Sequence, residues 1–284
     1  MLKQRTITAA IGLPVLLAAV WFSRPVPWFT MLVVVVGGAG VVEFYRLSGV
    51  ARVRSLLLFG TVWTVLAIAA RDTSVLTGLG LSMRSEELAL LLVTSATVLP
   101  LTWMLRRGPR NEAFANWAWC LAGIVYIGLL LGYFVALRQL DEGRNWVYFA
   151  LLTTFASDTA AFFVGRAWGK RRLAPSISPS KTWEGSVGGL LGACLVGLLF
   201  VPATAPWGPN PLQLTVLNYG SAAVLALLVS IVGQLGDLVE SLFKRNMGTK
   251  DSGRLFPGHG GALDRLDSVA FAGLVVYYFV WLIR

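Results

Sequence analysis

Long apolar segments alternate with short polar connections along the whole chain. A helix needs about 20 residues to cross a bilayer core of about 30 Å, and fewer suffice in a packed bundle. The apolar segments that approach this length lie near residues 6–23, 27–45, 55–70, 87–105, 115–137, 146–165, 185–202, 214–235 and 267–283. This pattern predicts an all-α, polytopic integral membrane protein with about nine transmembrane helices.

The composition excludes an ordinary soluble domain. Of the 284 residues, 56% are hydrophobic and only 13% are charged, whereas soluble domains carry roughly a quarter charged residues. The net charge of +10 is typical of cytoplasmic loops that lie against anionic lipid, so it does not call for nucleic acid as a partner. Cys120 and Cys194 lie inside apolar runs without metal-ligating neighbours, and we expect both to pack against apolar side chains.

Basic residues in the connections predict the orientation. With the N-terminus in the cytoplasm, most of the 24 Lys and Arg residues fall in cytoplasmic loops, as the positive-inside rule requires. An odd number of crossings then places Arg284 outside and the polar blocks described below in the cytoplasm. We expect residues 1–284 to form a single integral membrane domain. We expect this domain to lie in the inner (plasma) membrane. Residues 1–140 form mainly a helical scaffold, and residues 141–284 carry the active-site motifs.

Residues 241–267 form the most polar stretch of the chain, between two long apolar segments. Glycines there allow backbone N–H groups to approach an anion closely, and lysines and arginines supply charge for a triphosphate or a lipid phosphate. His259, the only histidine, is either a phosphate donor or a group that orders the loop. The alternative for the stretch as a whole is a solvated basic loop against anionic lipid.

The predicted eighth helix carries a polar stripe at positions i, i+3, i+4 and i+7. Its members are Asp237, Glu240, Ser241 and Lys244. Gly233 and Gly236 would allow a neighbouring helix to approach closely. A carboxylate near membrane depth is costly unless it is paired or bound to a cation, which favours a functional role for Asp237 over an ordinary helix end.

Three further acids are candidates for a metal site. Asp264 and Asp267 lie where the ninth helix begins, and each is either a helix-start acid or a magnesium ligand. We favour Asp237 and Asp264 as the ligand pair, because Mg²⁺ binds one or two carboxylates together with water and substrate phosphate. Asp267 is a further ligand or a partner of Arg265. Asp158, inside an apolar run, is either functional or a partner of a basic residue.

An earlier hydroxyl-rich and basic loop suits phosphate oxygens. It contains Ser176, Ser178, Ser180, Lys181 and Thr182, and Glu184 follows where it would cap the seventh helix. No G-x-x-x-x-G-K-[ST] sequence occurs in the chain, which argues against an ordinary P-loop ATPase.

Both polar blocks resemble one known family. The first motif has Ser241, Lys244-Arg245, Lys250-Asp251, Pro257, His259-Gly260-Gly261, Asp264-Arg265 and Asp267; the second runs from Ser157-Asp158-Thr159 to Ser178-Pro-Ser-Lys-Thr-Trp-Glu184-Gly185. These motifs are similar to those of phosphatidate cytidylyltransferases, also called CDP-diacylglycerol synthases. The resemblance covers the C-terminal half of the chain, and the N-terminal half matches only in being helical and apolar.

The resemblance implies the reaction CTP + phosphatidate → CDP-diacylglycerol + pyrophosphate in phospholipid biosynthesis. It also implies Mg²⁺, with Mn²⁺ as an alternative, bound by acids at the positions of Asp237 and Asp264, and a homodimer in contact with membrane lipids. Weaker metal candidates are Asp158, Glu240 and Asp267. The groups expected to hold phosphates and stabilise pyrophosphate are Lys181, Lys244, Arg245, Lys250, His259 and Arg265. Other expected substrate contacts are Ser178, Ser180, Thr182, Glu184, Ser241, Asp251, Gly260 and Gly261.

Two other functions remain open from the sequence. A CTP-dependent lipid kinase, such as a polyprenol kinase, would transfer the γ-phosphoryl group, and its product would not retain cytidine. An ion-coupled transporter would need paired broken helices near the bilayer midplane, whereas the charged residues here gather on the predicted cytoplasmic side.

Overall fold

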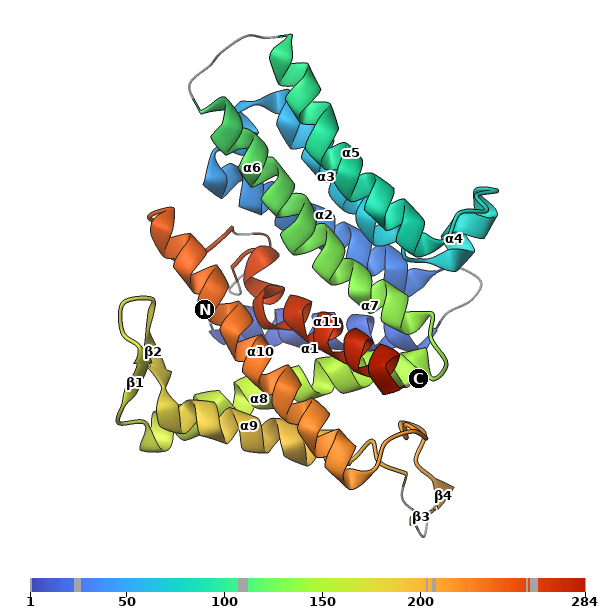
Figure 1. Cartoon of the computed structure of the whole chain (residues 1–284). Helices are drawn as coiled ribbons and strands as arrows, with labels where there is room; N and C mark the ends of the chain where they lie inside the picture. Colours follow the sequence, from blue (N-terminus) through green and yellow to red (C-terminus); the bar gives the residue numbers. More distant parts are fainter. Residues whose placement is uncertain are drawn as a thin grey trace. The chain divides into compact units, whose positions relative to one another are not determined.

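The computed structural model describes residues 2–22, 27–106, 112–202, 204–205, 208–253, 255 and 260–283. The chain divides into two compact units, and Figure 1 labels the helices and strands of both. The first contains residues 1–139 and 251–266, and the second contains residues 140–250 and 267–284. The predicted single membrane domain stays a prediction.

The first unit is built from helices. They are α1 (Leu2–Trp21), α2 (Trp28–Ser48), η1 (Val50–Arg52), α3 (Arg54–Ala69), α4 (Thr73–Gly78), α5 (Ser85–Leu105), α6 (Ala113–Gly123), η2 (Ile124–Leu129), α7 (Leu130–Arg138) and η3 (Leu263–Arg265). The π-helical segment η2 joins α6 and α7. The short helix η3 is distant in sequence from α2 but packs against it.

Tyr45 lies at the centre of the contact between α2, α3 and α6. Its side chain is fully buried, and its hydroxyl donates a hydrogen bond of 2.7 Å to the carbonyl of Cys120. Gly60 and Gly123 face its ring so closely that a methyl group at either position would overlap it. Cys120 is buried and Cys194 is partly buried, which confirms that Cys120 serves packing.

The second unit combines long helices with small hairpins. Its elements are α8 (Gly143–Trp168), β1 (Arg172–Ala174), β2 (Ser178–Thr182), α9 (Trp183–Leu198), β3 (Thr204–Ala205), β4 (Gly208–Pro209), α10 (Tyr219–Asn246) and α11 (Asp267–Ile283). Helix α8 packs along α9, and α10 packs against α8, α9 and α11. Strand β1 pairs with β2 and β3 pairs with β4, both antiparallel.

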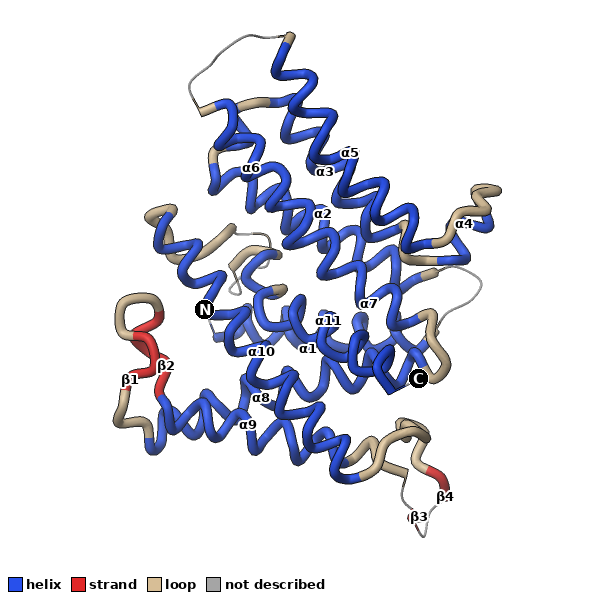
Figure 2. The backbone as a smooth tube through the Cα atoms, in the orientation of Figure 1, coloured by secondary structure: helices blue, strands red, loops and turns tan. Residues whose placement is uncertain are grey.

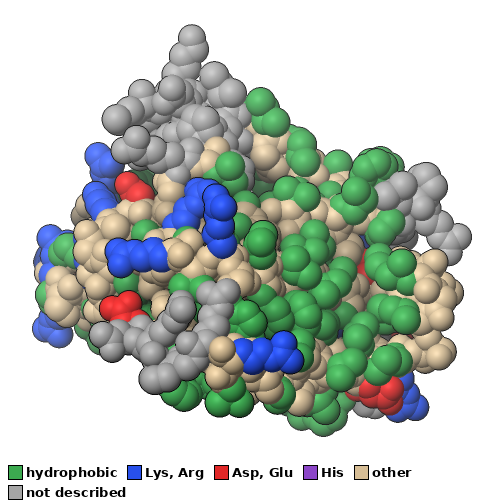
Figure 3. Space-filling view, turned by 90° about the horizontal axis from the view of Figure 1, so that it is seen from above, with side chains coloured by type: hydrophobic (Ala, Val, Ile, Leu, Met, Phe, Trp, Pro, Cys, Tyr) green, Lys and Arg blue, Asp and Glu red, His purple; other side chains and the backbone are tan. Residues whose placement is uncertain are grey.

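Each of the nine predicted apolar segments overlaps helical structure, and segment 115–137 extends over α6, η2 and α7. Within the described residues, five helices are long and apolar enough to cross a membrane: Trp28–Ser48, Ser85–Leu105, Ala113–Arg138, Gly143–Trp168 and Tyr219–Asn246. Shorter apolar helices occupy Ala10–Trp21, Arg54–Ala69, Trp183–Leu198 and Asp267–Ile283. Many large apolar side chains are exposed on these helices, and Figure 3 shows them over much of the face in view. The chain is therefore a predominantly helical membrane protein.

Two local expectations need correction. The sequence predicted loops where the structure has the strand pairs β1–β2 and β3–β4; Figure 2 draws strands in red. The predicted eighth helix, 214–235, begins only at Tyr219 and continues to Asn246. The side chain of Asn218 starts it by accepting a hydrogen bond from the Ser221 N–H, which satisfies one free donor of the first turn. The polar stripe therefore lies on a continuous helix.

Candidate active site

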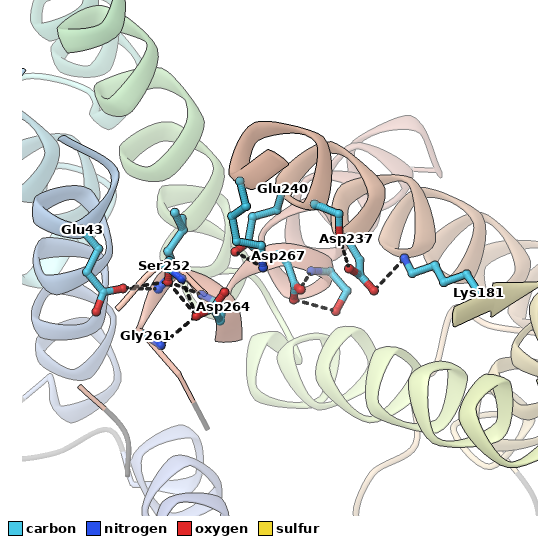
Figure 4. A network of polar contacts seen from close by, with 12 residues as sticks. Glu43, Lys181, Asp237, Glu240, Ser252, Gly261, Asp264 and Asp267 are labelled. Atoms are coloured by element: carbon cyan, nitrogen blue, oxygen red, sulfur yellow. Dashed lines mark hydrogen bonds and ion pairs between the residues drawn. The ribbon is translucent and has the colours of Figure 1, made fainter. Parts of the chain in front are cut away.

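Asp237 and Lys181 form an ion pair in the second unit. Lys181 Nζ, from strand β2, lies 2.7 Å from Asp237 Oδ2, and the side chains are 22% and 32% exposed (Figure 4). The Ser241 hydroxyl, one turn further along α10, donates to Asp237 Oδ1 over 3.4 Å. The carboxylate of Asp237 thus already accommodates one cationic group within a half-buried setting.

Glu240 and Lys244 form a second pair one turn along the same helix. Lys244 Nζ lies 3.0 Å from Glu240 Oε1, at the i, i+4 spacing, and the Glu240 side chain is almost fully buried. Acids that penetrate an apolar bundle require such a partner. These contacts confirm that Asp237, Glu240, Ser241 and Lys244 share a polar stripe on α10.

The β1–β2 hairpin brings the predicted phosphate-binding residues to this stripe. Strand β2 contacts α10, and Arg245 Nε donates to the carbonyl of Ile177 in the hairpin turn over 3.3 Å. Ser178 is partly buried and Ser180 is exposed on β2. The hairpin therefore gathers hydroxyl and basic groups beside Asp237.

Thr182, rather than Glu184, caps α9. The Thr182 hydroxyl accepts the Gly185 N–H over 3.1 Å, and Thr182 is buried. Glu184 instead accepts the backbone N–H groups of Lys170, at 3.0 Å, and Arg171, at 3.2 Å. The capping role expected for Glu184 is thus wrong, because its carboxylate closes the turn between α8 and β1. Substrate contacts by Thr182 and Glu184 stay predictions.

Asp158 and Asp267 meet at Ser268. The Ser268 hydroxyl lies 2.9 Å from Asp158 Oδ2 and 3.4 Å from Asp267 Oδ1, and the Ser268 N–H donates to Asp267 over 2.8 Å. A methyl group on Gly236 would come within 2.5 Å of the Asp267 carbonyl, which confirms that Gly236 permits close helix approach. The start of α11 therefore lies against α10 next to Asp237.

A partly buried network of serine and glutamine side chains, which the sequence did not predict, reaches α10 one turn before Asp237. Ser157 and Ser230 share a hydrogen bond of 2.7 Å between their hydroxyls. Gln234 donates to Ser230 over 3.1 Å and accepts from Ser186 over 2.5 Å. We call Ser157, Ser186, Ser230 and Gln234 the serine–glutamine network. It joins α8, α9 and α10 close to the helical turns that carry Asp158 and Asp237.

Asp264 belongs to a different cluster, inside the first unit. Its Oδ2 atom accepts the N–H groups of Ser252 and Gly261, at 2.9 and 2.8 Å, and the Ser252 hydroxyl at 2.8 Å. Glu43 Oε2, on α2, accepts the Leu263 N–H over 3.0 Å and lies 3.1 Å from the same hydroxyl, whose single proton serves one of the two carboxylates at a time. We call Glu43, Ser252, Gly261, Leu263 and Asp264 the Glu43 network (Figure 4).

The Glu43 network changes the role assigned to the glycines of the polar stretch. The sequence predicted that they let the backbone approach a phosphate. In the structure, Gly260 and Gly261 approach carboxylates of the chain itself, because a methyl group on Gly261 would overlap Glu43 and one on Gly260 would come within 2.6 Å of Asp264, whereas Gly248 has no such neighbour within 4 Å. Gly260 also has a backbone φ of +84°, a conformation that residues other than glycine rarely adopt. Substrate contacts by both glycines stay predictions.

The remaining predicted residues lie at the surface or outside the described residues. Lys250, Asp251 and Arg265 are exposed. His259 lies outside the residues that the structure describes. Each of the exposed residues is accessible to a ligand.

Asp237 and Asp264, the two favoured metal ligands, belong to different units. The structure therefore does not test whether they bind one metal ion together. Within the described ranges, no group of three or more His, Cys, Asp or Glu side chains is arranged to hold a metal ion. The oxygen donors present are nevertheless of the hard type that Mg²⁺ prefers, and Asp237 already faces the cationic Lys181 Nζ. Magnesium binding therefore stays a prediction that the donor chemistry fits.

Comparison with known proteins decides the family. The model described as the cytidylyltransferase family matches residues 3–283. The chain belongs to this family. The cytidylyltransferase match spans both units, so the N-terminal half is part of the family architecture and not an unrelated scaffold.

Individual relatives agree with the family match. The phosphatidate cytidylyltransferase of Bacillus subtilis is 32% identical over 280 residues, which cover 98% of this chain and 97% of the relative. That of Brucella suis is 36% identical over 285 residues, covering 98% and 93%. That of Staphylococcus haemolyticus is 43% identical over 162 residues, covering 56% and 57%. The chain is thus a nucleotidyltransferase-type enzyme with CTP as the family's substrate.

Proposed function

We propose that the chain catalyses CTP + phosphatidate → CDP-diacylglycerol + pyrophosphate. The observation that carries the proposal is the nearly full-length similarity to relatives named phosphatidate cytidylyltransferase. The grouping of basic, hydroxyl and carboxylate side chains around Asp237 supports it.

The chemistry requires no nucleophile from the protein. A phosphate oxygen of phosphatidate, already ionised at neutral pH, forms a bond to the α-phosphorus of CTP. The bond from that phosphorus to the oxygen bridging the α- and β-phosphates breaks, and pyrophosphate leaves with its electron pair. Two anionic reactants repel each other, so the protein must position them and neutralise their charge.

Basic residues on the hairpin and at the end of α10 suit this task. Lys181 lies on β2, and Arg245 is held by the hairpin turn. We assign phosphate binding and pyrophosphate stabilisation to these two residues together with Lys244, Lys250, His259 and Arg265. Ser178, Ser180, Thr182, Glu184, Ser241, Asp251, Gly260 and Gly261 complete the proposed substrate contacts.

Asp237 and Asp264 would hold Mg²⁺, or Mn²⁺ in its place, with Asp158, Glu240 and Asp267 as weaker candidates. The bound ion would neutralise phosphate charge in the transition state. Lys181 pairs with Asp237 in the structure; once Asp237 holds a metal ion, Lys181 would be available to a phosphate.

The proposed setting is the inner membrane, with nine crossings, a cytoplasmic N-terminus and the active site facing the cytoplasm. The loop charges support this orientation, and the five long and four shorter apolar helices of the described residues support the number of crossings. The acyl chains of phosphatidate would remain in the surrounding lipid. We also propose a homodimer as the functional form.

The test uses purified protein in mixed micelles with phosphatidate, Mg²⁺ and CTP labelled either in the cytosine ring or at the γ-phosphate. We expect cytosine label in the lipid extract, and its loss with EDTA and in Asp237→Ala and Asp264→Ala. Asp141→Ala, an exposed acid before α8, is the control and should retain activity.

Each other outcome contradicts a stated part of the proposal. Lipid label from the γ-phosphate alone would establish the kinase reaction instead. A folded wild-type protein that transfers neither label would refute the enzymatic proposal and turn attention to ion transport. Full activity in EDTA would refute the metal requirement.

A further inference from the structure

Glu43 is a buried acid in the part of the chain to which the sequence assigned only a scaffold role. It lies on α2 among the buried residues Val41, Phe44 and Tyr45, and it is 7% exposed. A carboxylate in such surroundings is strongly destabilising unless donors surround it. Its presence therefore requires compensation from nearby groups.

The hydrogen-bond donors that stabilise the Glu43 carboxylate come from the polar stretch, more than 200 residues later in the chain. The Leu263 N–H donates to Glu43 Oε2 over 3.0 Å. The Ser252 hydroxyl lies 3.1 Å from the same oxygen and donates its single proton either to it or to Asp264 Oδ2. A methyl group on Gly253 or on Gly261 would overlap the Glu43 carboxylate. The chain on either side of residues 254–259 thus closes tightly around this one side chain.

Both donors to Glu43 are also connected to Asp264. Leu263 directly precedes Asp264, and the Ser252 hydroxyl lies 2.8 Å from Asp264 Oδ2. The N–H groups of Ser252 and Gly261 converge on that same Oδ2 atom. The backbone and the hydroxyl therefore link the two acids, and a change at Glu43 would reach the groups that donate to the Asp264 carboxylate.

We propose that Glu43 is a positioning residue, which holds Asp264 together with Ser252, Gly261 and Leu263 in the geometry needed for metal and phosphate binding. The catalytic part of this inference depends on the proposed function; the positioning part depends only on the contacts within the first unit. Residues that orient a metal ligand in this way typically change metal affinity or activity by about 10- to 100-fold when removed.

Two substitutions separate geometry from charge. Both donors point to one oxygen, so Glu43→Gln, with its amide oxygen in that place, keeps an acceptor for both while losing the charge. Glu43→Ala removes the acceptor altogether. Asp72→Ala is the matched structural control: Asp72 is another buried acid of the first unit, and its hydrogen bonds go to Thr30 and Ser74.

The first measurement is hydrogen–deuterium exchange of the detergent-solubilised protein without substrate. In Glu43→Ala, we expect exchange at the amides of Ser252, Gly261 and Leu263 to accelerate about 10-fold or more, with Glu43→Gln close to wild type. Asp72→Ala should leave these amides protected. Unchanged protection in Glu43→Ala, or equal loss in Asp72→Ala, would overturn the positioning role.

The second measurement is Mn²⁺ binding by electron paramagnetic resonance, followed by the micelle assay over a range of Mg²⁺ concentrations. Glu43→Ala should weaken Mn²⁺ binding and lower kcat about 10- to 100-fold, while Glu43→Gln retains most of both. Wild-type Mn²⁺ affinity in Glu43→Ala would refute the link to the metal. If the wild type binds Mn²⁺ but transfers no cytidine to lipid, the proposed function fails while the positioning role stands.

Discussion

Glu43 and Asp264 in the first unit are stabilised in a different way from Asp237 and Glu240 in the second. In the first unit, Glu43 and Asp264 accept hydrogen bonds from backbone N–H groups and a serine hydroxyl. In the second unit, Asp237 and Glu240 pair with lysine ammonium groups. Backbone donors have fixed positions, whereas lysines have flexible stems and can exchange partners. The first arrangement suits a rigid frame, and the second suits a site where charged ligands enter and leave.

The largest loss of activity should come from replacing Lys181, the lysine that pairs with Asp237. Lys181→Ala removes both the cation beside Asp237 and a proposed phosphate ligand, so we expect kcat/KM to fall about 100- to 1000-fold, as for the loss of one transition-state donor. Stability should fall by about 1 kcal/mol or somewhat more, because the side chains are 22% and 32% exposed, between surface pairs worth roughly 0–1 kcal/mol and buried pairs whose breakage costs about 3–5 kcal/mol. The micelle assay and a thermal melt measure the two quantities.

Lys170→Ala is the control for Lys181→Ala. Lys170 is an exposed basic residue in the connection before β1, so its truncation removes a positive charge outside the stripe. We expect activity within about threefold of wild type for a surface substitution of this kind. Equal losses in Lys170→Ala and Lys181→Ala would show that only overall basic charge matters.

A smaller loss of activity should follow from a substitution that disrupts the packing of the Glu43 network. Gly261→Ala places a methyl group onto the Glu43 carboxylate and the Ser252 hydroxyl. Overpacking of this kind costs roughly 1–3 kcal/mol, so we expect a lower Tm together with activity reduced by about 10-fold or more. Gly78→Ala, also in the first unit, has no atom within 4 Å of the added group and should change neither quantity. A wild-type Tm and activity for Gly261→Ala would contradict the tight packing.

The smallest effect should come from the serine–glutamine network. Gln234→Leu removes the hydrogen bonds to Ser186 and Ser230, and side-chain hydrogen bonds between membrane helices average about 0.6 kcal/mol with a maximum of about 1.7. We expect a drop in Tm of a few degrees with most activity retained. Leu235→Ala, at an exposed neighbouring position, is the control. A loss of activity as large as that of Lys181→Ala would mean that Gln234 takes part in ligand binding.

The helical segments and the polar stripe were predictable because their signals are local. Apolar runs marked every long helix, and the spacing of Asp237, Glu240, Ser241 and Lys244 was enough to place them on one helix face. The hairpin was missed because its strands are short and their sequence, rich in serine and proline, has no alternation of apolar and polar residues. Glu184 was misassigned because the N–H groups that donate to it, those of Lys170 and Arg171, lie in a turn whose path depends on that hairpin.

Glu43 was missed for a different reason. One acid near the end of an apolar helix does not reveal its partner, although an acid in such a segment is itself a signal that compensation exists. The same is true of Ser157, Ser186, Ser230 and Gln234, which are spread over three helices.

The sequence by itself determined the membrane class, the nine apolar helical segments, the α10 stripe and the family, because periodicity, segment length and motif spacing are properties of contiguous residues. Only the tertiary structure decided that Lys181 partners Asp237 and that Glu43 meets Ser252 and Leu263. It also showed that Gly253, Gly260 and Gly261 lie closely against carboxylates of the chain itself. Those facts depend on which distant segments share a buried space, and the free-energy cost of leaving a carboxylate there without donors selects the partners.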